Sequence, residues 1–286
     1  MPEGVEVRWT TQCLKRHIEG LDLLQIVEYS QKSIKNNSLF KKPIGCTEVA
    51  CVGKVLYIKL EGPIDKLYLT IQFGLTGYLS LEKGKQYLRY SFLFGDLIVY
   101  YYDRINYGHI ELLKSADFFV KINKLGIDIF NPDDFNQHSL NTLIDLKGDS
   151  NICVFLIDQN ILAGIGNYAK SEILYHANLS PMRKVKTLST KERVKLYESI
   201  CFVVYSCYLA GFAENREGVY YNIFTNLDCS IENIVMIDLE LSRIIKAPSR
   251  YRIQVYNKTT DLFGNLVEKL ETDDKRTTYW VQELQR

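Results

Sequence analysis

Residues 158–175 read DQNILAGIGNYAKSEILY, and this stretch decides how the whole chain is interpreted. Gly164 and Gly166 permit a close approach of the backbone to a ligand. Asn167 then begins a predicted helix, whose free N–H groups and positive dipole end suit a phosphate. Close packing of two helices across a glycine-containing turn is the alternative interpretation, and it leaves the pairing of Asn167 with Glu172 unexplained.

Helical patterns follow one another around this stretch, from about residue 139 to residue 211. The last begins with a capping-box pattern, in which Ser189 is followed three residues later by Glu192, and it ends at a glycine. Residues 126–138 contain a proline and are predicted to be a linker. Residues 250–286 alternate and carry the turn signals FGN and TDDK, which predict an antiparallel β-hairpin.

The chain before the linker is predicted to be one helix followed by a β-rich domain. Residues 4–19 carry one apolar stripe at helical spacing, and Gly20 is the predicted stop. The stripe consists of Val7, Thr11, Leu14 and Ile18. From about residue 24 to 122, β-branched and aromatic runs alternate with glycine-containing turns, and FGDL is a predicted tight hairpin. The predicted fold class is α+β, with a β-sandwich or flattened barrel over 1–125 and a helical domain over 139–249.

Composition describes a folded protein of ordinary polarity. The 286 residues, 47% of them hydrophobic and 24% charged, are enough for two domains. A net charge of +1 leaves nucleic acid open as a partner, because a basic groove can coexist with an acidic back face. No secretory pattern begins the chain, and its apolar runs are shorter than the roughly 20 residues of a membrane span, so no membrane partner is expected.

Cysteines and histidines show no spacing typical of a metal site. The seven cysteines form no CxxC pair and the four histidines are scattered, so no metal is expected. An odd number of cysteines without a disulfide framework is typical of reduced thiols and predicts an intracellular protein that is not secreted. Cytosol, nucleus and a viral replication site are not distinguished, and a monomer is the default.

The N-terminal sequence MPEGVEV has two interpretations. Once Met1 is removed, Pro2 has a free secondary amine, and a chain terminus has a reference pKa of about 7.7–8.0 against about 10.4 for lysine. Roughly 10–20% of such an amine is neutral at pH 7, which makes it a nucleophile toward a sugar carbon, with Glu3 beside it as general acid. An ordinary helix start is the alternative, and this stretch alone favours it.

Four motifs, in this order, resemble the formamidopyrimidine-DNA glycosylase/endonuclease VIII family over essentially the whole chain. They are MPEGVEV at the N-terminus, GK at 53–54, DQ…AGIGNYAKSEIL at 158–174 and KRTTYW at 275–280. The first and third are specific in combination, and the other two gain weight from their position. GNYAKSEIL is similar to the endonuclease VIII branch, because the formamidopyrimidine branch usually has an Ile-Tyr pair after the asparagine.

The resemblance implies a bifunctional DNA glycosylase and abasic-site lyase of base excision repair, which favours oxidised pyrimidines and cleaves by β,δ-elimination. Its fold would be the β-sandwich followed by a helix–two-turn–helix (H2TH) domain, with DNA in the cleft between them. Pro2 would form a Schiff base with the sugar, Glu3 would donate a proton and Glu6 would be a supporting acid. Lys54 would assist β-elimination and Arg276 δ-elimination.

The same resemblance assigns residues to DNA binding. The phosphate contacts are Lys54, Asn167 and Arg276, and the supporting residues are Glu172, Gly164 and Gly166. Glu172 would tie its helix to the surroundings of the nucleophile. Leu75, Asn106 and Tyr107 would fill the space left by a flipped base. The family usually has an arginine where Asn106 stands, so opposite-base discrimination is expected to be looser, and Arg104 lies close by.

The C-terminal hairpin departs from the family pattern. Most relatives end in a zinc finger with four cysteines, whereas here no cysteine follows Cys229, so zinc cannot be held that way. DDKRTTYW is similar to the zincless finger of an endonuclease VIII-like subgroup, in which strand pairing and packing replace the metal. Tyr279 and Trp280 would supply that packing, and no cofactor is expected.

The expected partner is double-stranded DNA that contains oxidised bases or abasic sites, and single-stranded DNA remains open. Residues 212–249 are expected to hold part of the base pocket. Two alternatives to the main interpretation remain. One is a purine-directed formamidopyrimidine or 8-oxoguanine glycosylase, and the other is a non-catalytic H2TH DNA-binding protein.

Overall fold

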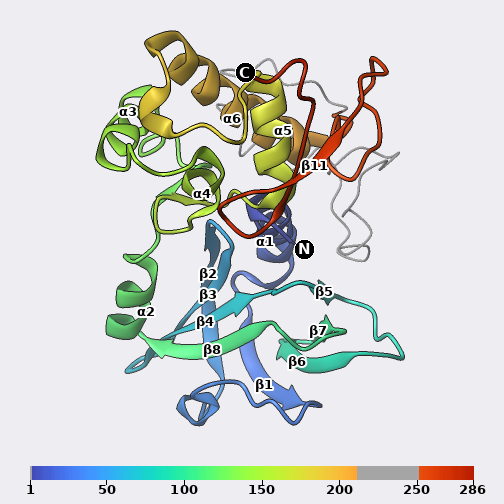
Figure 1. The fold of residues 1–286 in the computed structure, drawn as a ribbon. Helices are drawn as coiled ribbons and strands as arrows, with labels where there is room; N and C mark the ends of the chain where they lie inside the picture. The colour runs from blue at the N-terminus through green and yellow to red at the C-terminus, as the bar shows by residue number, and fades with distance from the viewer. Residues whose placement is uncertain (1, 211–250) are drawn as a thin grey trace. The chain divides into compact units, whose positions relative to one another are not determined.

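The computed structural model describes residues 2–210 and 251–286 of the chain (Figure 1). The described residues form two compact units, and the division falls between Lys124 and Leu125. The first unit contains one long helix and a large sheet, and the second contains helices and a hairpin. Residue 211, the predicted stop of the last helix, and residues 212–249 lie outside the described part.

Helix α1 (Gly4–Ile18) forms where the apolar stripe predicts it. All four stripe residues are buried: Val7, Thr11, Leu14 and Ile18. The helix ends before Gly20, which takes a φ of 89°, a left-handed conformation that glycine adopts without strain. The periodicity of this segment therefore predicts both the helix and the face that it buries.

Eight antiparallel strands form one hydrogen-bonded sheet in the order β5-β7-β6-β1-β2-β3-β4-β8. They are β1 (Asp22–Glu28), β2 (Ile44–Val52), β3 (Val55–Glu61), β4 (Lys66–Gln72), β5 (Gly77–Ser80), β6 (Leu88–Phe94), β7 (Leu97–Asp103) and β8 (His109–Lys114). The sheet doubles over into the predicted β-sandwich, because Leu79 on β5 and Leu112 on β8, at its two ends, share one core with Leu14 of α1. The predicted FGDL hairpin joins β6 to β7, where Phe94 pairs with Leu97.

Residues 115–122 correct the expectation of strands throughout 24–122, because they form helix α2 (Ser115–Ile122). Only Phe118 of this helix is buried, and it stacks on Tyr68 with ring centroids 3.8 Å apart. A single buried anchor leaves no helical stripe in the sequence, and the aromatic run FFV is typical of a strand. The short 3₁₀ helix η1 (Asn37–Leu39) completes the first unit.

The second unit begins with β9 (Ile127–Asp128), inside the segment expected to be a linker, and β9 pairs in parallel with β10 (Leu162–Ala163). Its helices are α3 (Gln137–Leu146), α4 (Ile152–Ile157), α5 (Asn167–Ala177), η2 (Val185–Thr187) and α6 (Thr190–Ala210). The predicted capping box before α6 is present, since the Ser189 N–H donates to Glu192 Oε2 at 2.7 Å.

The predicted C-terminal hairpin is confirmed as β11 (Glu268–Glu271) and β12 (Thr277–Trp280), joined by a turn over 272–276. Strand β12 packs against α5. Three buried valines, Val255, Val267 and Val281, form a small core with Tyr175 and Tyr279. The hairpin is therefore fastened to the helix that begins at the glycine-rich stretch.

Two expectations about the chain as a whole can be compared with the structure. Of the six cysteines in the described ranges, Cys46, Cys51, Cys153, Cys201 and Cys207 have free thiols, whereas Cys13 does not, so the expectation of reduced thiols throughout is wrong for Cys13. Within residues 2–210 and 251–286, no helix combines the length and apolar character that a membrane crossing needs.

Candidate functional site

The N-terminus of α1 holds three of the predicted catalytic residues next to one another. Glu3 is the N-cap, with extended backbone, and it forms a capping box with Glu6. Glu6 Oε2 accepts a hydrogen bond from the Glu3 N–H at 2.8 Å. Because this N–H belongs to the peptide bond between Pro2 and Glu3, the bond fixes the direction in which Pro2 leaves the helix. All three residues are buried, the two carboxylates at 2% and 3% exposure.

Lys54 lies in the two-residue turn between β2 and β3, where Val52 pairs with Val55. Gly53 takes a φ of 53°, which the first central position of a tight hairpin turn requires. Lys54 is half-buried in this turn. The predicted turn is thus confirmed, and it holds the backbone of Lys54 rigidly between two paired strands.

Leu75 and Tyr107 lie in two loops whose backbones touch. Gly74, with a φ of 63°, has no room for a side chain, because a Cβ there would lie 2.9 Å from the Gly108 nitrogen. Leu75 is 42% exposed and Tyr107 is 64% exposed, so both side chains are available to a partner. The structure therefore brings these two predicted void-filling residues onto neighbouring loops.

Asp103 ties the same two loops together, and sequence reasoning did not identify it. Its side chain is fully buried; Oδ2 accepts from the Gly108 N–H at 2.7 Å, and Oδ1 accepts from the Thr76 hydroxyl. The Thr76 oxygen in turn accepts from the Ile105 N–H at 3.2 Å. One buried carboxylate thus holds both loops, because each oxygen takes a donor from a different one.

Asn106 has a left-handed backbone, with a φ of 57°. Its side-chain amide donates to the Ser30 hydroxyl at 3.3 Å, and its carbonyl accepts from Lys32 Nζ at 3.3 Å. The amide would have to release Ser30 before it could bond to an unpaired base. Arg104, the neighbouring alternative, is exposed.

The glycine-rich stretch passes from β10 into α5 as the sequence predicts. Gly164 takes a φ of 117°, and Gly166 is the N-cap of α5. Asn167 is the first helical residue, and its Nδ2 donates to the Thr277 carbonyl of β12 at 3.0 Å. Its Oδ1 is buried and has no hydrogen-bond partner among the described residues. The start of α5 therefore contacts the finger directly.

Arg276 lies at the end of the finger turn, and its side chain is exposed. Lys275 before it has a left-handed φ of 58° and donates its N–H to the Thr272 carbonyl at 2.8 Å. The Arg276 carbonyl accepts from the Thr272 N–H at 3.1 Å, which closes the turn. The backbone of Arg276 is therefore fixed while its guanidinium is open to a partner.

Glu172 is fully buried on α5, and its carboxylate accepts four hydrogen bonds. Oε2 accepts from the Tyr251 hydroxyl and the Gln254 N–H, both at 2.8 Å. Oε1 accepts from the N–H groups of Val255 at 2.9 Å and Tyr256 at 2.8 Å. Burial raises the pKa of Glu172, and the three backbone N–H groups and the Tyr251 hydroxyl act in the opposite direction. These bonds tie α5 to the segment that leads into the finger.

Asp261 organises the turn of the finger that carries the FGN signal. Oδ1 accepts from the N–H groups of Phe263 and Asn265, and Oδ2 accepts from Asn265 Nδ2 and the Tyr175 hydroxyl, all at 2.8–2.9 Å. Burial raises the pKa of Asp261, but these hydrogen bonds outweigh it, so the pKa lies below its ordinary value. A carboxylate so fully occupied has no oxygen left for a metal.

The residues of the finger do not fit a zinc ion. Structural zinc takes four cysteine or histidine ligands, and residues 251–286, which include the finger and the segment that leads into it, contain neither residue type. The side-chain clusters of the described ranges include no group of three His, Cys, Asp or Glu placed to hold a metal. Hydrogen bonds to the Asp261 carboxylate and between α5 and β12 hold the finger in place.

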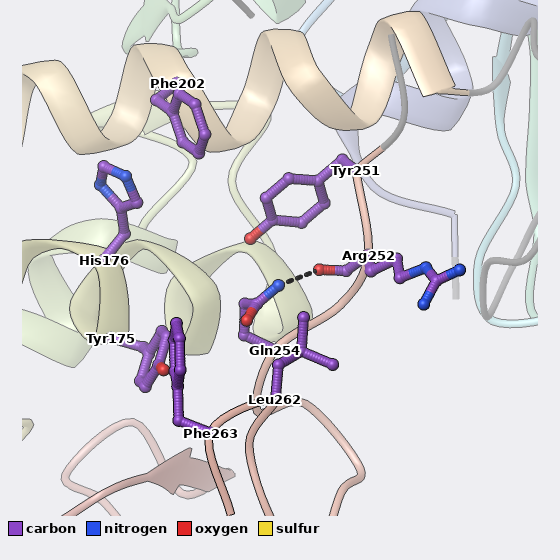
Figure 2. Close-up of a pocket in the computed structure, with 8 residues that line it drawn as sticks. All are labelled: Tyr175, His176, Phe202, Tyr251, Arg252, Gln254, Leu262 and Phe263. Atoms are coloured by element: carbon purple, nitrogen blue, oxygen red, sulfur yellow. Dashed lines mark hydrogen bonds between the residues drawn. The ribbon is translucent and has the colours of Figure 1, made fainter. Parts of the chain in front are cut away.

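A hollow of about 400 Å³ lies beside α5 and is lined mainly by aromatic and apolar side chains, which Figure 2 shows. His176 of α5 stacks on Phe202 of α6 with ring centroids 4.4 Å apart. Burial lowers the pKa of His176, and its Nδ1 is hydrogen-bonded to Ser199. The residues that line the hollow include no aspartate, glutamate, lysine, serine or cysteine. Residues 212–249, expected to contribute to a base pocket, lie outside the described residues.

Comparison with known proteins finds the same family along most of the chain. The family model "Formamidopyrimidine-DNA glycosylase H2TH domain" matches residues 125–209. A formamidopyrimidine-DNA glycosylase of Carboxydothermus hydrogenoformans is 31% identical over 209 residues, which cover 70% of this chain and 74% of that protein. One of Prochlorococcus marinus is 25% identical over 274 residues, which cover 89% and 85%.

Solved structures share the fold. The MutM (Fpg) protein of Thermus thermophilus has a TM-score of 0.78 and 21% identity, and the match covers 99% of this chain and 98% of that one. The Lactococcus lactis Fpg, solved with DNA that contains an oxidised pyrimidine, has a TM-score of 0.77 and 19% identity over both whole chains. The strands, helices and finger described above are thus the parts of a known architecture.

Proposed function

Because the chain belongs to the formamidopyrimidine-DNA glycosylase/endonuclease VIII family, we propose that it is a bifunctional DNA glycosylase and abasic-site lyase that acts on oxidised bases. One observation carries the proposal. The Pro2–Glu3 peptide is held at the N-terminus of α1 by the 2.8 Å hydrogen bond to Glu6. A protein that only binds DNA has no need for Pro2, whose amine becomes free once Met1 is removed, to be held beside two buried carboxyl groups.

The first chemical step joins Pro2 to the sugar of the damaged nucleotide. The amine nitrogen bonds to C1′ as the glycosidic bond breaks, and the leaving base takes up the amine proton. Glu3 then protonates the ring oxygen O4′ while the C1′–O4′ bond breaks, which leaves an iminium ion. Glu6 supports this step by holding the Glu3 backbone, and with it Pro2.

Strand cleavage follows from the electron-withdrawing iminium. Loss of a proton from C2′ breaks the C3′–O bond, and loss of a proton from C4′ then breaks the C5′–O bond. Both phosphates leave with their bonding electrons, and water hydrolyses the remaining imine to release Pro2. Lys54 assists the first elimination and Arg276 the second, because cations stabilise departing phosphates.

DNA contacts divide between phosphate and base positions. Lys54, Asn167 and Arg276 contact phosphates, and the N–H groups at the start of α5 add a site for an anion. Leu75 and Tyr107 enter the space that a flipped base leaves, and the shared support of their loops by Asp103 favours that role. The enzyme acts as a monomer on intracellular double-stranded DNA, and its finger needs no zinc or other cofactor.

Oxidised pyrimidines are the preferred substrate in this proposal, because the motif GNYAKSEIL is similar to the branch that favours them. The relatives compared above are named formamidopyrimidine-DNA glycosylases, and this favours purine lesions as the second candidate. The two candidates share the same Pro2 chemistry, so they differ only in which base is released.

The test uses a C-terminally tagged protein whose N-terminal Pro2 is verified by intact mass. It is incubated with duplexes that contain an abasic site, an oxidised pyrimidine or 8-oxoguanine, and borohydride is added. A covalent protein–DNA adduct that maps to Pro2 is expected, with Glu3→Gln reducing the adduct from the damaged bases. Absence of any adduct with the abasic duplex would refute the proposed lyase activity. Faster release of 8-oxoguanine than of the oxidised pyrimidine would make purine lesions the preferred substrate.

A further inference from the structure

A buried ion pair joins α5 to the turn that carries Arg276. Lys170 Nζ lies 2.6 Å from Asp274 Oδ2, and the two side chains are 0% and 1% exposed. Lysine and aspartate are almost never fully buried unless they are paired. Desolvation of two charges offsets most of their attraction, so such a pair is weak support for stability. We therefore expect the pair to act mainly on the positions of the neighbouring groups and less on stability.

The two oxygens of Asp274 have different tasks. Oδ2 binds Lys170, while Oδ1 accepts from the Thr272 hydroxyl at 2.5 Å and from the Arg276 N–H at 3.3 Å. The same carboxylate therefore shapes the turn and attaches it to α5. Because the Arg276 N–H donates a hydrogen bond to Asp274, any movement of Asp274 moves the backbone of Arg276 as well.

A second contact lies one helical turn away on α5. Asn167 Nδ2 donates to the Thr277 carbonyl at 3.0 Å, and Lys170 follows Asn167 by three residues, which places both on one face of the helix. Their partners, Thr277 and Asp274, are also three residues apart and lie on either side of Arg276. Helix α5 thus contacts the finger at two points, one on each side of Arg276 in the sequence.

The Arg276 side chain is exposed and makes no hydrogen bond with the described residues, so its place is set by its backbone alone. We propose that the Lys170–Asp274 pair is a positioning pair, which holds Arg276 at a fixed distance from Asn167 so that both engage phosphates of one strand. This inference rests on the proposed lyase activity. It predicts that the pair controls the second elimination more than the first, because Arg276 assists the second elimination and Lys54 assists the first.

The test compares four proteins with an abasic duplex under single-turnover conditions at saturating protein. They are the wild type, the neutral pair Lys170→Met/Asp274→Asn, the conservative Lys170→Arg, and the control Lys186→Met/Asp149→Asn. The control removes an exposed ion pair of the same unit, whose side chains are 55% and 80% exposed. Asparagine keeps an oxygen for the Arg276 N–H, so the neutral pair removes the ion pair while leaving the turn an acceptor.

The neutral pair is expected to lower the ratio of δ- to β-elimination product about tenfold, since a 1 Å misplacement of a catalytic group can cost about a hundredfold and a smaller displacement costs less. Borohydride trapping and Tm should stay near the wild type, Lys170→Arg should keep the wild-type ratio, and the control should change nothing. Hydrogen exchange at the amides of Lys275, Arg276 and Thr277 should become faster in the neutral pair only.

When the wild type is active, two results overturn the inference. A neutral pair with a wild-type product ratio shows that Arg276 does not depend on Lys170 and Asp274. A neutral pair that loses trapping, product ratio and Tm together shows a merely structural contact. Failure of the wild type to form an adduct counts against the proposed function instead, and the amide exchange rates then decide the inference alone, because unchanged exchange refutes it.

Discussion

Replacement of Glu172 by glutamine tests how α5 holds the segment that leads into the finger. The carboxylate accepts from four groups, and three of them are backbone N–H groups that can only donate. A glutamine has one oxygen, so its NH₂ group must face either Val255 and Tyr256 or Gln254 and Tyr251. At least one buried N–H then loses its acceptor.

The cost can be worked from these bonds. Each hydrogen bond to a charged group contributes about 1.5–3 kcal/mol, and two are lost. A new bond from the glutamine NH₂ to the Tyr251 oxygen recovers about 1 kcal/mol. Glu172→Gln should therefore destabilise by about 2–5 kcal/mol, a large part of the roughly 5–15 kcal/mol that holds a typical domain folded. This corresponds to a loss in Tm on the order of 10 °C.

The assay follows unfolding through Trp280, which is buried in the finger, in a Trp9→Phe background that removes the other tryptophan. Glu271→Gln on β11 is the matched control, because that side chain is exposed and should change stability by less than about 0.5 kcal/mol. A Glu172→Gln protein as stable as this control would refute the reasoning. It would mean that Glu172 is protonated in the folded state, as burial favours, and that glutamine reproduces it.

Three other predictions concern stability. The hydrogen bond from Arg183 lowers the pKa of Glu192 from 4.5 to about 2. The stability that this ionised carboxylate contributes is therefore complete above pH 4.5 and is lost as the pH falls toward 2. Urea titrations between these pH values should show that Glu192→Gln removes about 1 kcal/mol of the pH dependence of the free energy of unfolding, after allowance for solvent screening. Gly108→Ala should lower Tm sharply, because the new Cβ would lie 1.8 Å from the Tyr101 hydroxyl oxygen, and adding Tyr101→Phe should restore part of the loss. A zinc chelator should leave Tm unchanged, whereas Asp261→Ala should lower it, and a chelator-induced loss would contradict the zincless finger.

Local sequence patterns predicted the elements that depend on neighbouring residues. The stripe of α1 is a four-residue periodicity, and the turns at Gly53, Gly95 and Gly264 need positive φ angles that glycine supplies. The Ser189–Glu192 capping box joins residues three positions apart. Helix α2 was not predicted because its only buried residue, Phe118, packs against an aromatic partner on a distant strand. An element that depends only on residues close together in the chain can therefore be predicted from the sequence.

The finger shows why the remainder could not be predicted. The sequence shows that no cysteine follows Cys229, but it does not show which contacts fasten the finger to the rest of the unit. These contacts join residues far apart in the chain: Tyr175 with Asp261, separated by 86 residues, and Lys170 with Asp274, separated by 104. In the sequence, Lys170 resembles any solvated lysine on a helix. Only the fold, in which β12 packs against α5, buries the Lys170 ammonium group and fixes the backbone position of Arg276.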